Sequence, residues 1–408
     1  LKCHNGRVGV FGNSYSGFYA LMAAASGHPA IRAVSPQAPI CDWFLGDDFH
    51  HNGALALSDA VGFLPNFGTA ARTKPTDRPE PFDTPVKGNP VEYLHDNTVA
   101  DITRALGGSI PFWDEMAAHP DYDSWWQQRS ALNATHDIRP AILMVGGLFD
   151  AEDLYGTWNI YRAIRQNNPQ TDCRIVMGPC THGAWRSNGD ANAVGHIRFS
   201  EESLSQFYRH QVEFPFFDHY LRDAEHSGAT TTGALIFFSG ENCWREMEGW
   251  DPENQSRPHT LYLAEGGSLT TAPSDISEAY SFYTSDPNDP VPYYPDMPWP
   301  RRKEYMTVGQ EFLDGRHDVL TFLSPRLEND MAVIGPIDVT LHAAISTTDA
   351  DFVVKIIDVG PDGEYEMMVR GDIMRGRYRN GFSSPEAFTP GKVERITLML
   401  PDVAHTFM

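Results

Sequence analysis

The sequence has no long hydrophobic run, a shortage of positive charge and few cysteines. Because no stretch of about 18 apolar residues occurs among its 408 residues, no segment is predicted to span a membrane. Lys and Arg number 31 against 54 Asp and Glu, and the net charge of −23 argues against nucleic acid and anionic membrane surfaces as partners. The cysteines have no C-x-x-C spacing, so no structural zinc site is predicted, and we expect no other metal and no cofactor. The five are Cys3, Cys41, Cys173, Cys180 and Cys243, of which Cys173 and Cys180 are expected as buried free thiols.

What is present is a set of three residues that each follow a predicted strand. Ser14 lies in Val-Gly-Val-Phe-Gly-Asn-Ser-Tyr-Ser-Gly, Asp150 closes Ala-Ile-Leu-Met-Val-Gly-Gly-Leu-Phe-Asp, and His182 follows Arg-Ile-Val-Met-Gly-Pro-Cys-Thr. The chain order Ser, Asp, His is that of the α/β-hydrolases. A serine hydroxyl needs an imidazole to take its proton, and the imidazole needs a carboxylate to orient it. We therefore predict a catalytic triad for acyl transfer, with the backbone N–H of Tyr15 as an oxyanion donor.

Each member of this set also has an ordinary explanation. Ser14 alone is typical of a turn, Asp150 alone of a helix N-cap before a helix predicted over 152–168, and His182 is one of sixteen histidines. The segment departs from the G-x-S-x-G form, because a glycine stands at the third residue after Ser14, at Gly17. The joint order of three strand-end residues favours the triad.

The chain also lacks strands before the one that leads to Ser14. A doubly wound hydrolase sheet has several strands before its nucleophile strand, and a loop among them supplies the second oxyanion donor. We therefore expect the chain to be a fragment without its N-terminal part. We expect residues 1–408 alone to be poorly soluble or inactive, because an unpaired central strand invites aggregation.

Composition and hydrophobic pattern divide the sequence into three parts. Residues 1–40 and 139–225 alternate strand and helix patterns, as expected for an α/β catalytic domain, and 41–138 are aromatic and proline-punctuated, as expected for a cap insertion. Residues 228–408 show short alternating runs between turns, typical of a β-sandwich. The predicted catalytic elements are strands at 7–12, 31–36, 142–145 and 174–177 and helices at 14–27, 152–168 and 202–222, the last broken at Pro215. The predicted sandwich strands include 234–238, 260–263, 337–343 and 352–359.

Four phrases of the sequence carry a resemblance to a known family. They are Gly12-Asn-Ser-Tyr-Ser-Gly-Phe18, Gly147-Leu-Phe-Asp-Ala-Glu-Asp153, Gly178-Pro-Cys-Thr-His-Gly183 and Gly335-Pro-Ile-Asp-Val-Thr340. The chain resembles the group of cocaine esterase, Xaa-Pro dipeptidyl-peptidase and α-amino-acid ester hydrolase over its whole length. The resemblance implies an α/β-hydrolase domain with a helical cap and a C-terminal jelly roll, and an acyl-enzyme mechanism without metal or cofactor. It also implies a homo-oligomer, with tetramers common in the family, and favours a periplasmic or secreted location. Cys180 stands where the family usually has tryptophan, so this chain departs from the family at the local wall of the substrate pocket.

Within this group, three carboxylates that bind the substrate's α-ammonium distinguish the α-amino-acid ester hydrolases. Two follow the triad aspartate, where this sequence has Glu152 and Asp153, and the third follows the nucleophile at the spacing of Asp48. Carboxylates that converge on one site suit a bound cation, because their mutual repulsion otherwise raises their pKa values. The alternative is that Glu152 and Asp153 are first-turn acids of a helix and Asp48 is a solvated loop charge.

The predicted activity is hydrolysis or acyl transfer on α-amino-acid esters, with β-lactam amides as a further substrate class. Alternatives with the same chemistry are an Xaa-Pro dipeptidyl-peptidase, a glutaryl-cephalosporin acylase and a general carboxylesterase. The carboxylates argue against an anionic glutaryl substrate, but they suit the N-terminal amine of a peptide equally well. A different class, a catalytically dead protein that binds carbohydrate through its sandwich, is disfavoured by the intact triad.

Overall fold

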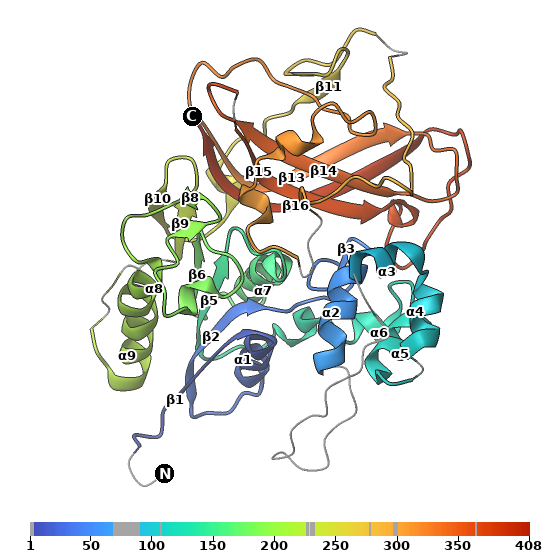
Figure 1. The fold of residues 1–408 in the computed structure, drawn as a ribbon. Helices are drawn as coiled ribbons and strands as arrows, with labels where there is room; N and C mark the ends of the chain where they lie inside the picture. Colours follow the sequence, from blue (N-terminus) through green and yellow to red (C-terminus); the bar gives the residue numbers. More distant parts are fainter. Residues whose placement is uncertain are drawn as a thin grey trace.

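Six strands form the central sheet, in the spatial order β1-β2-β5-β6-β9-β10. The computed structural model describes residues 4–67, 90–106, 108–225, 228, 233–276, 279–296, 301–363 and 365–408 (Figure 1). The strands are β1 (Val8–Ser14), β2 (Ile31–Pro39), β5 (Ala141–Gly147), β6 (Cys173–Gly178), β9 (Ala234–Phe238) and β10 (Cys243–Met247). The first five are parallel and β10 runs antiparallel to β9. The carboxyl ends of β1, β5 and β6 therefore meet at one edge of the sheet.

Helices cover both faces of this sheet, and the strands alternate to meet them. Val34, Ile142 and Ile175 belong to a core with α1 (Tyr15–Ala25) and α7 (Leu154–Asn167). Their neighbours along the strands belong to a second core on the opposite face. That face is covered by α8 (Leu204–Phe207), a π-helix (Tyr208–Glu213) and α9 (Phe214–Arg222). Strands buried on both faces read as continuous apolar runs.

The predicted break at Pro215 is wrong, because the structure continues helically through it. Pro215 lies in the first turn of α9, which follows the π-helix directly.

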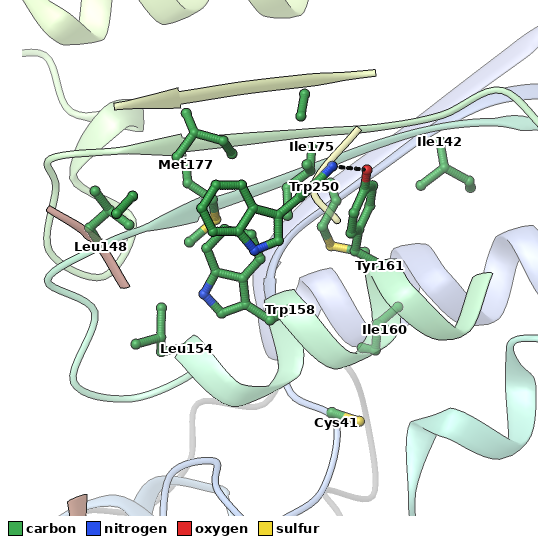
Figure 2. Close-up of a cluster of buried hydrophobic side chains, with 14 of the residues drawn as sticks. Cys41, Ile142, Leu148, Leu154, Trp158, Ile160, Tyr161, Ile175, Met177 and Trp250 are labelled. Carbon is green, nitrogen blue, oxygen red and sulfur yellow. Dashed lines mark hydrogen bonds between the residues drawn. The ribbon is translucent and has the colours of Figure 1, made fainter. Parts of the chain in front are cut away.

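Two tryptophans hold the loop after β10 onto α7. The ring of Trp250 stacks on that of Trp158, with centroids 5.1 Å apart (Figure 2). The backbone N–H of Trp250 donates to the hydroxyl of Tyr161 at 3.1 Å, shown dashed in Figure 2. Both indoles are buried, so the chain that leaves the sheet is part of the catalytic core.

The cap between β2 and β5 is mainly helical and has its own aromatic core, with Phe44, Trp113 and Trp126 fully buried in it. Its elements are β3 (His50–His51), β4 (Ala54–Leu55), α2 (Leu57–Phe67), α3 (Pro90–Asp96), α4 (Val99–Leu106), α5 (Pro111–Ala118), α6 (Ser124–Gln127) and a 3₁₀ turn (Ala131–Ala134). In Figure 1 these cyan and blue helices lie beside the central sheet, beneath the orange and red strands.

The C-terminal β-domain has four long strands, which pair as β13–β16 and β14–β15. Apolar side chains from both pairs pack in one cluster. They lie over both the central sheet and the cap (Figure 1). The strands are β13 (Met331–Ala343), β14 (Asp351–Val359), β15 (Glu366–Arg375) and β16 (Glu394–Phe407). The smaller elements are β7 (Ala193–Val194), β8 (Ile197–Arg198), α10 (Pro252–Gln255), β11 (Tyr262–Ala264) and β12 (Ser268–Thr270), with 3₁₀ turns at Ala184–Arg186, Tyr305–Thr307, Gln310–Leu313 and Gly376–Tyr378.

The prediction that the β-domain includes 234–238 needs correction. This segment is β9, which pairs in parallel with β6, and β10 continues the same sheet. All five residues of β9 are buried. An apolar run of this length shows that a strand is buried, but its pattern does not say which sheet it joins.

The cysteines behave as isolated thiols. Cys41, Cys173 and Cys180 are buried and free, and Cys243 is free and partly buried. The prediction of buried thiols at Cys173 and Cys180 is therefore confirmed, while Cys3 lies outside the described residues. In the part of the chain that the structure describes, no helix is both long and apolar enough to cross a membrane.

Candidate active site

Ser14 lies at a strained corner between β1 and α1. Its backbone has φ 64° and ψ −129°, a conformation that is costly for a residue with a side chain and is typical of functional turns. A Cβ on Gly12 would collide with the backbone carbonyl of Ser16, and one on Gly17 would lie 2.5 Å from the carbonyl oxygen of Gln37 on β2. The glycine at the third position after the serine therefore permits the close strand–helix approach that this elbow needs.

Asp150 follows β5 and faces His182, which follows β6. Asp150 Oδ1 accepts the backbone N–H groups of Glu152 (2.8 Å) and Asp153 (3.1 Å). Its Oδ2 lies 2.9 Å from His182 Nδ1, where an Nδ1–H donates to it. Burial opposes ionisation of Asp150, but the charge of His182 and these hydrogen bonds outweigh it and lower the pKa of the carboxyl. Asp150 is thus held as a carboxylate.

More than one carboxylate acts on His182. Burial disfavours the imidazolium, but the charge and hydrogen bond of Asp150 outweigh burial, and with Glu152 and Asp48 they raise the pKa of His182 to about 9. Its Nε2 lies 3.3 Å from Asn13 Nδ2 and 3.6 Å from Glu152 Oε2. His182 must therefore lose the Nε2 proton of its imidazolium form before Nε2 can act as a general base.

The hydroxyl of Ser14 points to a carboxylate. Ser14 Oγ donates to Asp153 Oδ2 at 3.5 Å, and among the described residues no hydrogen bond joins Ser14 to His182. Catalytic hydrogen bonds are often long or misaligned in unliganded enzymes and tighten when substrate binds. The structure brings Ser14, Asp150 and His182 to one edge of the sheet, and Asp153 Oδ2 lies 3.5 Å from Ser14 Oγ and 3.9 Å from His182 Nδ1.

The three predicted ammonium-binding carboxylates meet beside Ser14 and His182. Asp153 is fully buried and Asp48 is 7% exposed, whereas the Glu152 side chain is one-third exposed. The N–H of Asp48 donates to the carbonyl of Glu152 at 3.0 Å, and Asp48 Oδ2 accepts the indole N–H of Trp43 at 2.9 Å. The cap therefore delivers Asp48 to the segment that carries the other two.

Burial and mutual repulsion act on these carboxyls. Burial, opposed by the Trp43 hydrogen bond and supported by the charge of Glu152, raises the pKa of Asp48 to about 7. Burial raises the pKa of Asp153 well above its ordinary value, and the charges of Asp48, Asp47 and Asp150 add to this. A cation placed among these groups would restore their ionised forms.

Two alternatives to the ammonium site do not fit this geometry. Asp153 occupies the N-cap of α7, but its side chain accepts no hydrogen bond from the helix N–H groups. Its Oδ1 is buried and has no hydrogen-bond partner among the described residues. Asp48 is not a solvated loop charge, because the cap buries it.

Asp47, Asn13 and Trp43 belong to the site although the sequence analysis did not select them. Asp47 is fully buried, and its carboxyl accepts the N–H groups of Cys41 at 2.7 Å and Gly156 at 2.8 Å. It thereby joins the start of the cap to α7, while burial raises its pKa to about 8. The adjacent acidic pair Asp47-Asp48 was the available signal, but spacing alone does not separate a structural from a binding carboxylate.

Three aromatic rings lie beside the carboxylates, and one of them, Trp43, donates its indole N–H to Asp48. Tyr15 stacks on Trp43 with centroids 6.2 Å apart, and Phe112 meets Trp43 edge-on at 5.1 Å. All three rings are partly exposed. Tyr15 opens α1, as the predicted oxyanion role requires. Cys180 is buried in an apolar cluster with Trp185.

Residues 2–184 match the X-Pro dipeptidyl-peptidase (S15 family), and residues 220–408 match the X-Pro dipeptidyl-peptidase C-terminal non-catalytic domain. The cocaine esterase of Rhodococcus sp. (strain MB1 Bresler) is 27% identical over 99% of this chain and 71% of its own length.

Two solved structures are similar over 99% of the chain. An aminopeptidase from a marine sediment archaeon, Thaumarchaeota archaeon, is 34% identical, with a TM-score of 0.87 and 67% of its chain covered. An α-amino acid ester hydrolase is 31% identical, with a TM-score of 0.86 and 68% covered. These similarities confirm the predicted fold class, an α/β-hydrolase with a C-terminal β-rich domain.

Proposed function

The chain belongs to the X-Pro dipeptidyl-peptidase (S15) family, a group of serine hydrolases that act on esters or dipeptides, and from this premise we propose that it hydrolyses esters of α-amino acids. Ser14 Oγ attacks the acyl carbon while His182 Nε2 takes its proton and Asp150 holds the imidazole. The ester C–O bond then breaks, the alcohol leaves with the proton from His182, and water releases the acyl group from Ser14. The N–H of Tyr15 donates to the oxyanion.

One observation carries the choice of substrate. The buried carboxyl of Asp153 lies 3.5 Å from the nucleophilic oxygen and has an oxygen without a partner among the described residues. An acyl group on Ser14 Oγ places its α-substituent one carbon from the reacting centre, within reach of this carboxyl. A protonated α-amine supplies both the hydrogen bonds and the charge, and an unpaired buried charge is otherwise costly.

Aminopeptidase activity is the second candidate. A peptide presents the same α-ammonium beside its scissile carbonyl, and the 34% identical solved structure is that of an aminopeptidase. β-Lactam amides of α-amino acids fall within the same argument, whereas an Xaa-Pro dipeptidyl substrate carries its free ammonium one residue further from the scissile carbonyl. A glutaryl substrate is an anion and would meet three carboxylates. A general esterase would leave the buried Asp153 carboxyl without a use.

The test is a pair of substrates, an α-amino ester and the matching ester without the amine. Asp153→Asn and Glu152→Gln keep the shape of each side chain and remove one charge. A hydrogen bond to a charged group is worth about 1.5–3 kcal/mol, so the ratio of kcat/KM between the two esters should fall about ten- to a hundredfold. The ratio cancels any shared effect on the triad, and it is measured where the amine is protonated.

Two further variants serve as controls. Glu201→Gln removes one exposed charge and should leave the ratio unchanged. Ser14→Ala should lower kcat by several orders of magnitude on both esters. Equal losses on both esters in Asp153→Asn would instead favour a general esterase. Turnover of α-amino-acid anilides by the parent enzyme would extend the activity to amides.

A further inference from the structure

One strand of the C-terminal domain lies along the junction of the other two parts. Met368 on β15 belongs to the core that the central sheet forms with α1 and α7. Met374, further along the strand, belongs to the cap core. Side chains two apart on a regularly paired stretch of strand share a face, so Arg370 and Asp372 lie on the same face as Met374. Both make contacts outside their own domain.

Arg370 holds the turn that carries Asp150. Its Nη1 donates to the carbonyl oxygen of Leu148 at 2.9 Å, and the turn closes with the Asp150 N–H donating to the Gly147 carbonyl at 3.2 Å. The N–H of Leu148 donates to the carbonyl of Gly178 at the end of β6, and that of Phe149 donates to the carbonyl of Cys180. The donor to the Leu148 carbonyl thus comes from the β-domain.

The local structure of β15 aims this side chain. The pairing with β14 shifts register directly before Arg370, so that Val369 is an extra residue in the strand. Such bulges commonly re-aim a side chain near a functional site. Arg370 is 3% exposed, and its Nε has no hydrogen-bond partner among the described residues. A buried cation with so few partners is poor for stability, which favours a role in positioning.

Asp372 holds the cap hairpin that follows Asp48. Its carboxylate oxygens lie 2.9 Å from His51 Nδ1 and 3.3 Å from Asn52 Nδ2. The N–H of Arg375 donates to the Asn52 carbonyl at 3.1 Å. Asn52 stands at the β3–β4 turn with φ 48°, four residues after Asp48. The hairpin and the carboxylate before it are therefore fixed to β15.

We propose that β15 aligns the two halves of the active site, Arg370 by positioning Asp150 and Asp372 by positioning Asp48. Both are positioning residues, since neither reaches the reacting atoms. The Arg370 half needs only the triad, whereas the Asp372 half rests on the proposed function. The β-domain then sets how the triad and the ammonium site face each other.

The Arg370 half is tested with Arg370→Met, which is similar in length and uncharged. We expect kcat to fall about tenfold on both the α-amino ester and its des-amino match, with KM within twofold. Rates are divided by the active sites titrated with a fluorophosphonate. The acidic limb of the des-amino ester profile, set by His182 among Asp150, Asp153, Glu152 and Asp48, should move to lower pH because Asp150 supports the imidazolium less well.

Arg370→Lys keeps a cation and a donor and should recover part of the rate, and it replaces Arg370→Met if that variant does not fold. A merely structural role would lower Tm and the number of active sites but leave kcat per site and the pH limb unchanged. That result would overturn the Arg370 half.

The Asp372 half is tested with Asp372→Asn on the same two esters. We expect KM for the α-amino ester to rise three- to tenfold and the des-amino ester to be unaffected. Asp358→Asn is the matched control, because the Asp358 carboxylate on β14 contacts His405 at 3.1 Å and, among the described residues, no hydrogen bond joins it to the cap or to the triad, and it should change neither KM. Equal changes on both esters would overturn this half. A parent enzyme without preference for the α-amino ester would overturn the proposed function and the Asp372 half together, while kcat still judges Arg370.

Discussion

At the scale of single residues, this site brings together ionisable groups that shift each other's pKa. The pKa of Asp48 is raised to about 7 by burial, against its Trp43 hydrogen bond and with the charge of Glu152. The same carboxyl helps to raise the pKa of His182 to about 9. A carboxyl kept in such a place lowers stability at neutral pH, a cost that active sites often carry for function.

Asp48→Asn tests this coupling, because asparagine can still accept the Trp43 N–H. The folded-state pKa of Asp48 lies above its unfolded value, so the unfolded chain binds fewer protons and the parent loses stability as pH rises from about 4 through about 7. The variant should therefore gain a few degrees in Tm at pH 8 and little at pH 4. Thermal unfolding at the two pH values measures this gain.

The same variant should move the acidic limb of the des-amino ester profile to lower pH, because one charge that supports the His182 imidazolium is gone. It should also weaken the α-amino ester selectively. A Tm gain that is equal at pH 4 and pH 8, or an unmoved limb, would contradict the coupling between Asp48 and His182.

At the scale of elements, the β1–α1 corner depends on a glycine in an unusual place. Gly17 lets the first turn of α1 approach β2, where an added Cβ would lie 2.5 Å from the Gln37 carbonyl. That contact is with backbone, which cannot rotate away. The position of Ser14 and the packing of α1 are therefore set together.

Gly17→Ala should destabilise the fold by about 1–3 kcal/mol, as overpacking does, and should lower kcat because α1 carries Ser14 at its start. Tm and kcat per titrated site measure the two effects. Gly189→Ala is the control, since its added Cβ would meet only Ser187 Oγ at 3.7 Å. A Gly17→Ala enzyme with the parent's Tm and kcat would show that the elbow tolerates a side chain there.

At the scale of the whole molecule, buried polar contacts fasten the β-domain to the catalytic domain. Asp402 on β16 accepts the indole N–H of Trp250 at 2.7 Å and pairs with Arg162 on α7. His405 on the same strand lies 2.9 Å from the hydroxyl of Ser239, which follows β9. Because these contacts are buried, we expect the two domains to unfold together.

Asp402→Asn should lower Tm by a few degrees while calorimetry still shows one transition. Removing one partner of a buried charged contact is destabilising, since the other partner remains; the partly exposed Arg162 limits the loss. The area and number of calorimetric transitions in parent and variant check this. Two separate transitions in the parent would mean that the domains unfold independently.

The sequence by itself determined the order of the candidate site and the elements that carry it. Ser14, Asp150 and His182 were found because each follows a short apolar run, and a strand's end is a local property. The carboxylates Glu152, Asp153 and Asp48 were selected only through the resemblance to the α-amino-acid ester hydrolases. The cap was visible as a change in texture between two strands of one sheet.

Only the tertiary structure decided which distant segments meet. It placed β9 in the central sheet, buried Asp48 under the cap, and directed Ser14 Oγ to Asp153. It also brought Arg370 and Asp372 to the site from more than two hundred residues along the chain. Local periodicity reports whether a residue is buried, but pairing and charge contacts depend on the other chain segment, and no pattern within one segment contains that information.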